Sequence, residues 1–94
     1  MALVAIRTSD HSSEWIERFR GAVQAFPEIV EAYRTSGETD YLLVVRVTTI
    51  AAFDRFYQQL VDRVPLHDVR STFVMEELKR TTELPLDHLA DGPD

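Results

Sequence analysis

A short polar stretch in the middle of the chain carries residue types that could bind an amino acid. Within Ser36–Tyr41, Gly37 can adopt a positive φ, and turn N–H groups can receive a carboxylate. Asp40 can accept hydrogen bonds from an ammonium group, and Ser71 and Thr72 offer hydroxyl groups later in the chain. On these residues alone a plain hairpin is favoured, because Gly-x-x-Asp between two strands is usually only a turn.

The remaining polar residues do not predict catalysis or metal binding. The histidines, His11, His67 and His88, are scattered, and the absence of cysteine excludes thiol catalysis and cysteine-based metal sites. Glu76 and Glu77 resemble a carboxylate pair, but adjacent strand residues point to opposite faces. We therefore expect no catalytic residue, no bound metal and no cofactor.

Composition favours one small acidic domain. The chain has 94 residues, and its formal net charge of −6 gives it no electrostatic reason to bind nucleic acid or anionic lipid. No signal peptide and no transmembrane segment are evident, and a chain without cysteine suits a reducing compartment. These features predict a cytoplasmic protein.

The N-terminal half predicts a strand, a helix and a strand. Residues 2–8 are apolar and β-branched, and residues 9–13 form a cluster that favours a turn and a helix N-cap. A helix that ends at Pro27 and a strand over residues 29–36 follow. The apolar face of the helix consists of Trp15, Phe19, Ala22, Val23 and Phe26.

The C-terminal half predicts a strand, a helix and a strand after the turn at residues 37–39. The first strand covers residues 40–47, and Thr48 and Thr49 can cap a helix that ends at Pro65. Residues 69–76 alternate as a last strand. The apolar face of the second helix consists of Phe53, Phe56, Tyr57, Leu60, Val61 and Val64.

This order of elements predicts an α+β fold of the ferredoxin-like βαββαβ type, with an antiparallel four-stranded sheet and both helices on one face. The strand over residues 40–47 is apolar on both faces. Its residues Leu43, Val45 and Val47 point one way, and Leu42 and Val44 point the other way. Because two helices cover only one face, we expect the chain to form a dimer through its sheets.

Three stretches of the sequence carry a resemblance to a known family. The run from Ala25 to Val45, which includes Thr35-Ser36-Gly37-Glu38-Thr39-Asp40-Tyr41, closely resembles the effector-sensing domain of Lrp/AsnC transcription regulators, often called RAM. Asp54-Arg55-Phe56-Tyr57 and the run Val69–Lys79 agree with it, and the match covers roughly residues 2–86. We therefore divide the chain into a ligand-binding domain over residues 1–86 and a flexible acidic tail over residues 87–94.

The resemblance implies a function and an assembly. It implies dimers formed through the sheets, often arranged as an octamer of four dimers, with an amino-acid effector in the cleft between dimers. It places the ligand loop at the turn. The implied ligand-binding residues are Ser36, Gly37, Glu38, Thr39, Asp40, Tyr41, Ser71 and Thr72.

The sequence departs from the family in two respects, and two other functions stay open. Family regulators carry a helix-turn-helix domain ahead of this one, so we expect a stand-alone or shortened sensor that binds no DNA itself and can assemble with full-length relatives. His67 stands where a glycine is common. The alternatives are a small ferredoxin-like dimeric enzyme of the monooxygenase or isomerase type and an oligomerisation module without a ligand.

Overall fold

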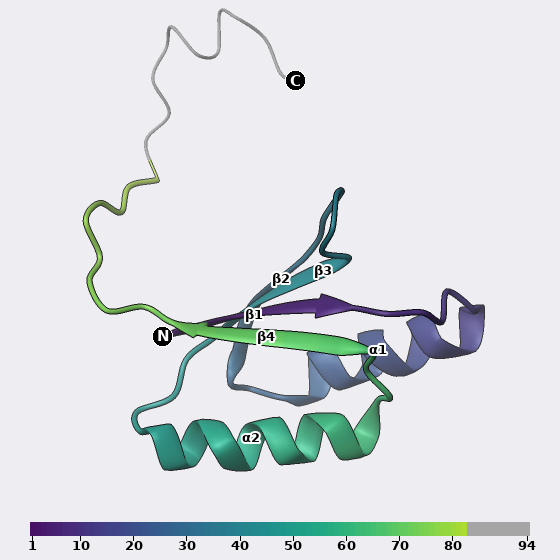
Figure 1. Cartoon of the computed structure of the whole chain (residues 1–94). Coiled ribbons are helices and arrows are strands. Elements are labelled where there is room, and N and C mark those ends of the chain that lie inside the picture. Colours follow the sequence, from purple (N-terminus) through teal and green to yellow (C-terminus); the bar gives the residue numbers. More distant parts are fainter. Residues whose placement is uncertain (83–94) are drawn as a thin grey trace, which may run out of the picture.

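The computed structural model describes residues 1–82 and has six elements in the order that the sequence predicts (Figure 1). The predicted tail at residues 87–94 and the last residues of the predicted domain lie outside the described part. The elements are β1 (Ala2–Arg7), α1 (Ser13–Ala25), β2 (Ile29–Arg34), β3 (Tyr41–Val45), α2 (Ile50–Arg63) and β4 (Asp68–Phe73).

The four strands form one antiparallel sheet in the order β2-β3-β1-β4. Strand β1 lies in the middle and pairs Leu3 with both Val44 of β3 and Thr72 of β4. Both helices cover the same face of the sheet, and we call the opposite face the open face (Figure 1). The ferredoxin-like prediction is therefore confirmed.

Both helices begin at the predicted caps. The Ser12 hydroxyl accepts a hydrogen bond from the Trp15 N–H at 3.2 Å, and the Thr49 hydroxyl accepts one from the Ala52 N–H at 3.0 Å. Each bond satisfies one of the N–H groups that the first helical turn leaves without a partner. Local sequence therefore fixes where each helix starts.

The core lies between the sheet and the helices. Alternate residues of β1 and β3 supply one side of it, and the predicted helical faces supply the other. Thr8 is the only buried polar residue in the described part of the chain. The fully or nearly fully buried side chains include Val4, Ile6, Trp15, Phe19, Leu43, Val45, Phe56, Leu60 and Val64.

The strands around the turn and at the C-terminus are shorter than predicted. Strand β4 ends at Phe73 and not at Glu76, because Phe73 already pairs with Ala2, the first residue of β1. One more hydrogen bond, from the Val74 N–H to the Met1 carbonyl, follows at 2.9 Å. The alternation of residue types continues beyond this point, but the partner strand does not.

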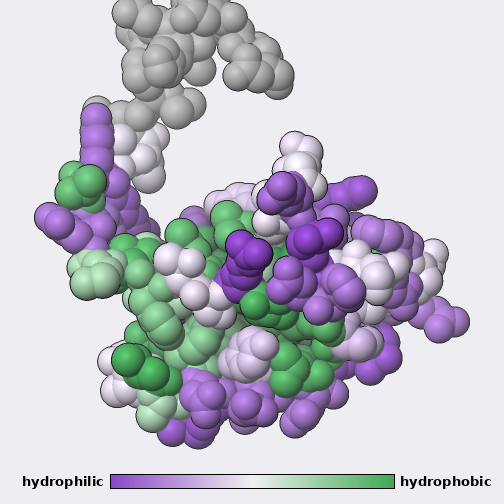
Figure 2. Space-filling view, viewed as in Figure 1, coloured by the Kyte–Doolittle hydropathy of each residue, from purple (hydrophilic) through white to green (hydrophobic). Residues whose placement is uncertain are grey.

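The open face is partly apolar, as the two-sided pattern of β3 predicts. Leu42 and Val44 lie on it opposite Ala5 and Leu3 of β1. Apolar side chains also gather along the β4 edge, where the sheet meets α2 (Figure 2). At this edge Phe73 lies on the helix side of the sheet, because it pairs with the buried Ala2. It is 43% exposed and packs edge-on against Phe53, with ring centroids 5.0 Å apart. Neither helix described between residues 1 and 82 has the length and apolarity needed to cross a bilayer.

Candidate functional site

The β2–β3 turn has the predicted backbone geometry. Gly37 has a φ of +98°, and it is the only described residue with a positive φ. The Thr35 N–H donates to the Asp40 carbonyl at 2.9 Å, and the Thr35 hydroxyl donates to the Thr39 carbonyl. The turn projects away from both helices, so it stands above the open face of the sheet (Figure 1).

Asp40 anchors this turn to the end of β1. Its Oδ2 accepts a hydrogen bond from the Thr8 N–H at 2.8 Å, and its own N–H donates to the Ile6 carbonyl at 2.9 Å. Among residues 1–82 its second carboxylate oxygen has no hydrogen-bond partner. One carboxylate oxygen of Asp40, which we predict to bind the ligand's ammonium group, is therefore held by Thr8, and the other oxygen is available for a ligand.

A small hollow of about 60 Å³ lies between the turn and the open face. Glu38 and Thr39 line it from the turn, and Ala5 of β1 lies on its floor. The pairing of β1 with β4 brings further residues to the hollow that the sequence pattern did not indicate. Arg70 of β4 lies opposite Ala5, and Asp68 lies opposite Arg7.

The hollow carries charged groups of both signs. Arg7 and Arg70 contribute guanidinium groups, and Glu38 and Asp68 contribute carboxylates. Within the described residues none of these four side chains forms an ion pair or a hydrogen bond. An amino-acid zwitterion also carries a carboxylate and an ammonium group close together, so the hollow can match both ends with charge-assisted hydrogen bonds.

The structure does not bring all the predicted ligand residues to this hollow. Ser71 pairs with Val4 and therefore faces the helices, whereas Thr72 pairs with Leu3 and lies on the open face. Ser36 is exposed in the turn. The ring of Tyr41 packs on the helix side, with its centroid 4.6 Å from that of Phe19.

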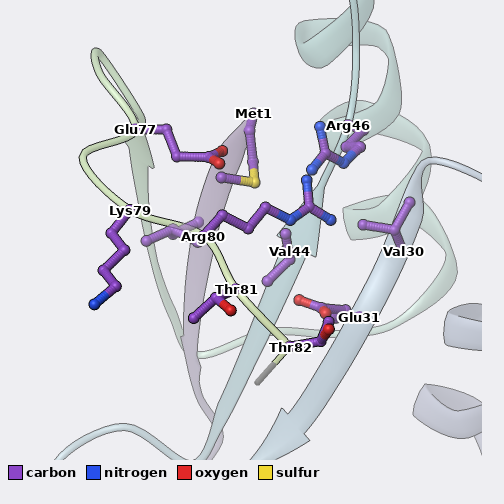
Figure 3. Close-up of a pocket in the computed structure, with 11 residues that line it drawn as sticks. Met1, Val30, Glu31, Val44, Arg46, Glu77, Lys79, Arg80, Thr81 and Thr82 are labelled. Carbon is purple, nitrogen blue, oxygen red and sulfur yellow. The ribbon is translucent and has the colours of Figure 1, made fainter. Parts of the chain in front are cut away.

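A larger hollow of about 630 Å³ lies farther along the open face, under the segment that follows β4 (Figure 3). Leu3 and Val44 lie on its floor. Arg80 extends across it past Val44, and Lys79 points away from it (Figure 3). Val44 is only 8% exposed, so the chain itself covers part of the apolar open face.

The chain is similar to a family of bacterial regulatory domains. The family model described as the Lrp/AsnC ligand binding domain matches residues 1–84. The glutamate uptake regulatory protein of Zymomonas mobilis is 47% identical over 88 residues, which are 94% of this chain and 54% of that protein. The DNA-binding transcriptional activator DecR of Escherichia coli K12 is 47% identical over 87 residues, 92% of this chain and 57% of that protein.

Solved structures of related regulators have the same fold. An AsnC family transcriptional regulator from Agrobacterium tumefaciens is 52% identical with a TM-score of 0.83, covering 94% of this chain and 57% of that chain. A transcriptional regulator from Neisseria meningitidis, solved as a complex with L-Met, is 35% identical with the same TM-score of 0.83 and the same coverage. This chain therefore spans a little over half the length of these relatives.

Proposed function

This chain belongs to the Lrp/AsnC ligand-binding domain family, and from that premise we propose that it senses an amino acid beside its β2–β3 turn. One observation carries the proposal. Guanidinium and carboxylate groups without ion-pair partners among residues 1–82 meet in one hollow beneath a turn that Gly37 shapes. The L-Met complex of the Neisseria relative supports an amino acid as the class of effector.

We assign the two ends of the ligand by charge. Arg7 and Arg70 line the hollow and, together with backbone N–H groups of the turn, would hold the ligand carboxylate. Glu38 and Asp68 line the hollow and would hold the ammonium group. Asp40 does not line the hollow but follows Thr39, which does, and its available oxygen would be a further acceptor. The hollow is too small for a long side chain, so this side chain would extend out of it, toward a neighbouring subunit.

We propose that the domain acts as a homodimer joined through the open faces. A neighbouring dimer would complete the effector cleft, and up to four dimers would form a ring. The half-exposed apolar pair of Ala5 with Leu42 supports this arrangement, because it leaves apolar surface at the centre of the open face beside the part that the chain itself covers over Val44. Light scattering should give a mass of at least two chains at micromolar concentration. A monomer mass would contradict this assembly.

We propose that the domain regulates transcription in the cytoplasm without contacting DNA itself and without catalysis. The formal charge of −6 opposes binding to a phosphate backbone. In the described part of the chain the interior holds one buried polar residue, Thr8, which is already hydrogen-bonded and offers no catalytic group. Any effect on DNA would pass through assembly with full-length relatives.

A thermal-shift screen of the whole chain against the twenty amino acids tests the effector site. A ligand at a hundredfold excess over its Kd should raise the free energy of unfolding by ~2.7 kcal/mol. Arg70→Gln should weaken the binding of the strongest ligand roughly two- to fivefold. Arg55→Gln, an exposed change on α2, should leave the affinity unchanged.

Two results would contradict the proposal. No stabilisation by any amino acid, in a protein confirmed as folded, would favour the oligomerisation module without a ligand. If an amino acid stabilises Arg70→Gln as strongly as it stabilises Arg55→Gln, the hollow is not the effector site.

A further inference from the structure

A third hollow lies on the helix side of the sheet, in a groove between α1 and the edge strand β2. It has a volume of about 460 Å³, within the range of small-molecule sites. It exists because the helix layer stops short of β2. Ala32 pairs with Leu43 and faces the helices with it, yet Leu43 is fully buried and Ala32 is exposed.

The floor and one wall of this groove are apolar and firmly packed. The half-buried Tyr41 lies on the floor beside Phe19, which is 4% exposed and stacks on Trp15 with centroids 5.1 Å apart. Ile16 and Val23 of α1 are half-buried along the wall. A flat apolar or aromatic group would gain both area burial and ring contacts there.

The rim of the groove is positively charged. Arg20 of α1 and Arg34 of β2 line it from the two sides, and among the described residues no acidic one lines it. Within residues 1–82 neither guanidinium forms an ion pair or a hydrogen bond. Two unpaired cations beside one hollow, in a chain with a formal charge of −6, provide a local site for an anion.

We propose that this groove binds a small aromatic monocarboxylate. Its ring would pack against Tyr41 and the half-buried Ile16 and Val23, and its carboxylate would lie between Arg20 and Arg34. This site is distinct from the proposed effector hollow, which opens on the opposite face of the sheet. Tyr41 lines the groove and is also the first residue after the β2–β3 turn, so a ligand in the groove would affect the position of the turn through Tyr41.

An NMR titration of the whole chain tests the proposal with two matched probes, 3-phenylpropionate and its neutral amide, 3-phenylpropanamide. The carboxylate should produce saturable shifts at the backbone amides of Val23 and Ala32 and leave the amide of Arg70 unmoved. It should bind roughly fivefold or more tightly than the neutral amide, as expected for an exposed contact between charges.

Variants separate the arginines from general effects of charge. Arg20→Gln and Arg34→Gln should each weaken binding of 3-phenylpropionate roughly fivefold, whereas Arg55→Gln on α2 should not change it. Equal affinity for the two probes, or shifts that saturate only around Arg70, would overturn the proposal. Either result would leave the amino-acid screen and its Arg70 variant unaffected, so the two sites fail independently.

Discussion

Replacing Asp40 should separate its structural role from its proposed role in binding. Thr8 is 7% exposed, and its N–H donates to Asp40 Oδ2 at 2.8 Å. Asp40→Ala leaves this buried N–H without a partner, which costs about 1–3 kcal/mol of the free energy of unfolding. For a chain of this size, each kcal/mol lowers the Tm by roughly 4–8 °C.

Asp40→Asn is the informative companion. Its amide oxygen can still accept from the Thr8 N–H, so most of the stability should be retained, while the negative charge for the ligand ammonium is lost. Because Asp40 is only half-buried, loss of its charge should weaken amino-acid binding by roughly two- to fivefold, as expected for a solvent-accessible charge contact. Urea unfolding without ligand and calorimetry with the strongest ligand of the screen measure the two effects.

Glu38→Ala is the matched control for stability, because it removes the same charge from the same turn and its side chain makes no hydrogen bond within residues 1–82. It should change the free energy of unfolding by less than about 0.5 kcal/mol. Equal stability of Asp40→Ala and Glu38→Ala would refute the anchoring role of Asp40. Unchanged affinity in a folded Asp40→Asn would remove Asp40 from the ligand site.

Three further substitutions should each change the stability of the fold in a direction that the structure predicts. Gly37→Ala should destabilise by about 1–2 kcal/mol in urea unfolding, because at a φ of +98° the cost lies in the backbone and no atom lies within 4 Å of the added Cβ. Gly21→Ala, in the interior of α1 with the same open space, should instead stabilise by roughly 0.5–1 kcal/mol; a shared sign would contradict the backbone argument. Hydrogen bonds from the hydroxyl and backbone N–H of Ser12 hold the pKa of Asp10 below its usual 3.8. The ionised Asp10 therefore stabilises the fold above about pH 4, and this contribution is lost as the pH falls through the lowered pKa. Asp10→Asn should remove this contribution from an acid unfolding curve followed by circular dichroism.

Local pattern was sufficient to predict the fold. Ser12 and Thr49 stand directly before apolar residues at helical spacing, and both cap the helices that the structure contains. The two apolar faces of β3 predicted correctly that Leu43 and Val44 point to opposite sides of the sheet. These signals lie within a few residues of each other, so a single sequence contains them.

The candidate site depends on pairing between distant strands, and the sequence showed only part of it. Arg7 and Arg70 reach the turn because β1 pairs with β3 on one side and with β4 on the other. No local pattern states that register. The same limit explains Ser71, which is adjacent to Thr72 in the sequence but lies on the other face of the sheet.

The central position of β1 has a consequence for the order in which the chain folds. The β2–β3 hairpin involves only neighbouring residues and can form early, with a short loop to close. Of the four strands, β1 is synthesised first, yet Leu3 pairs with Val44 on one side and with Thr72, which is synthesised much later, on the other. The earliest strand made is therefore one of the last to be fully paired. Until β4 pairs with it, β1 presents an edge of unpaired backbone N–H and C=O groups that a chaperone or a second nascent chain could occupy.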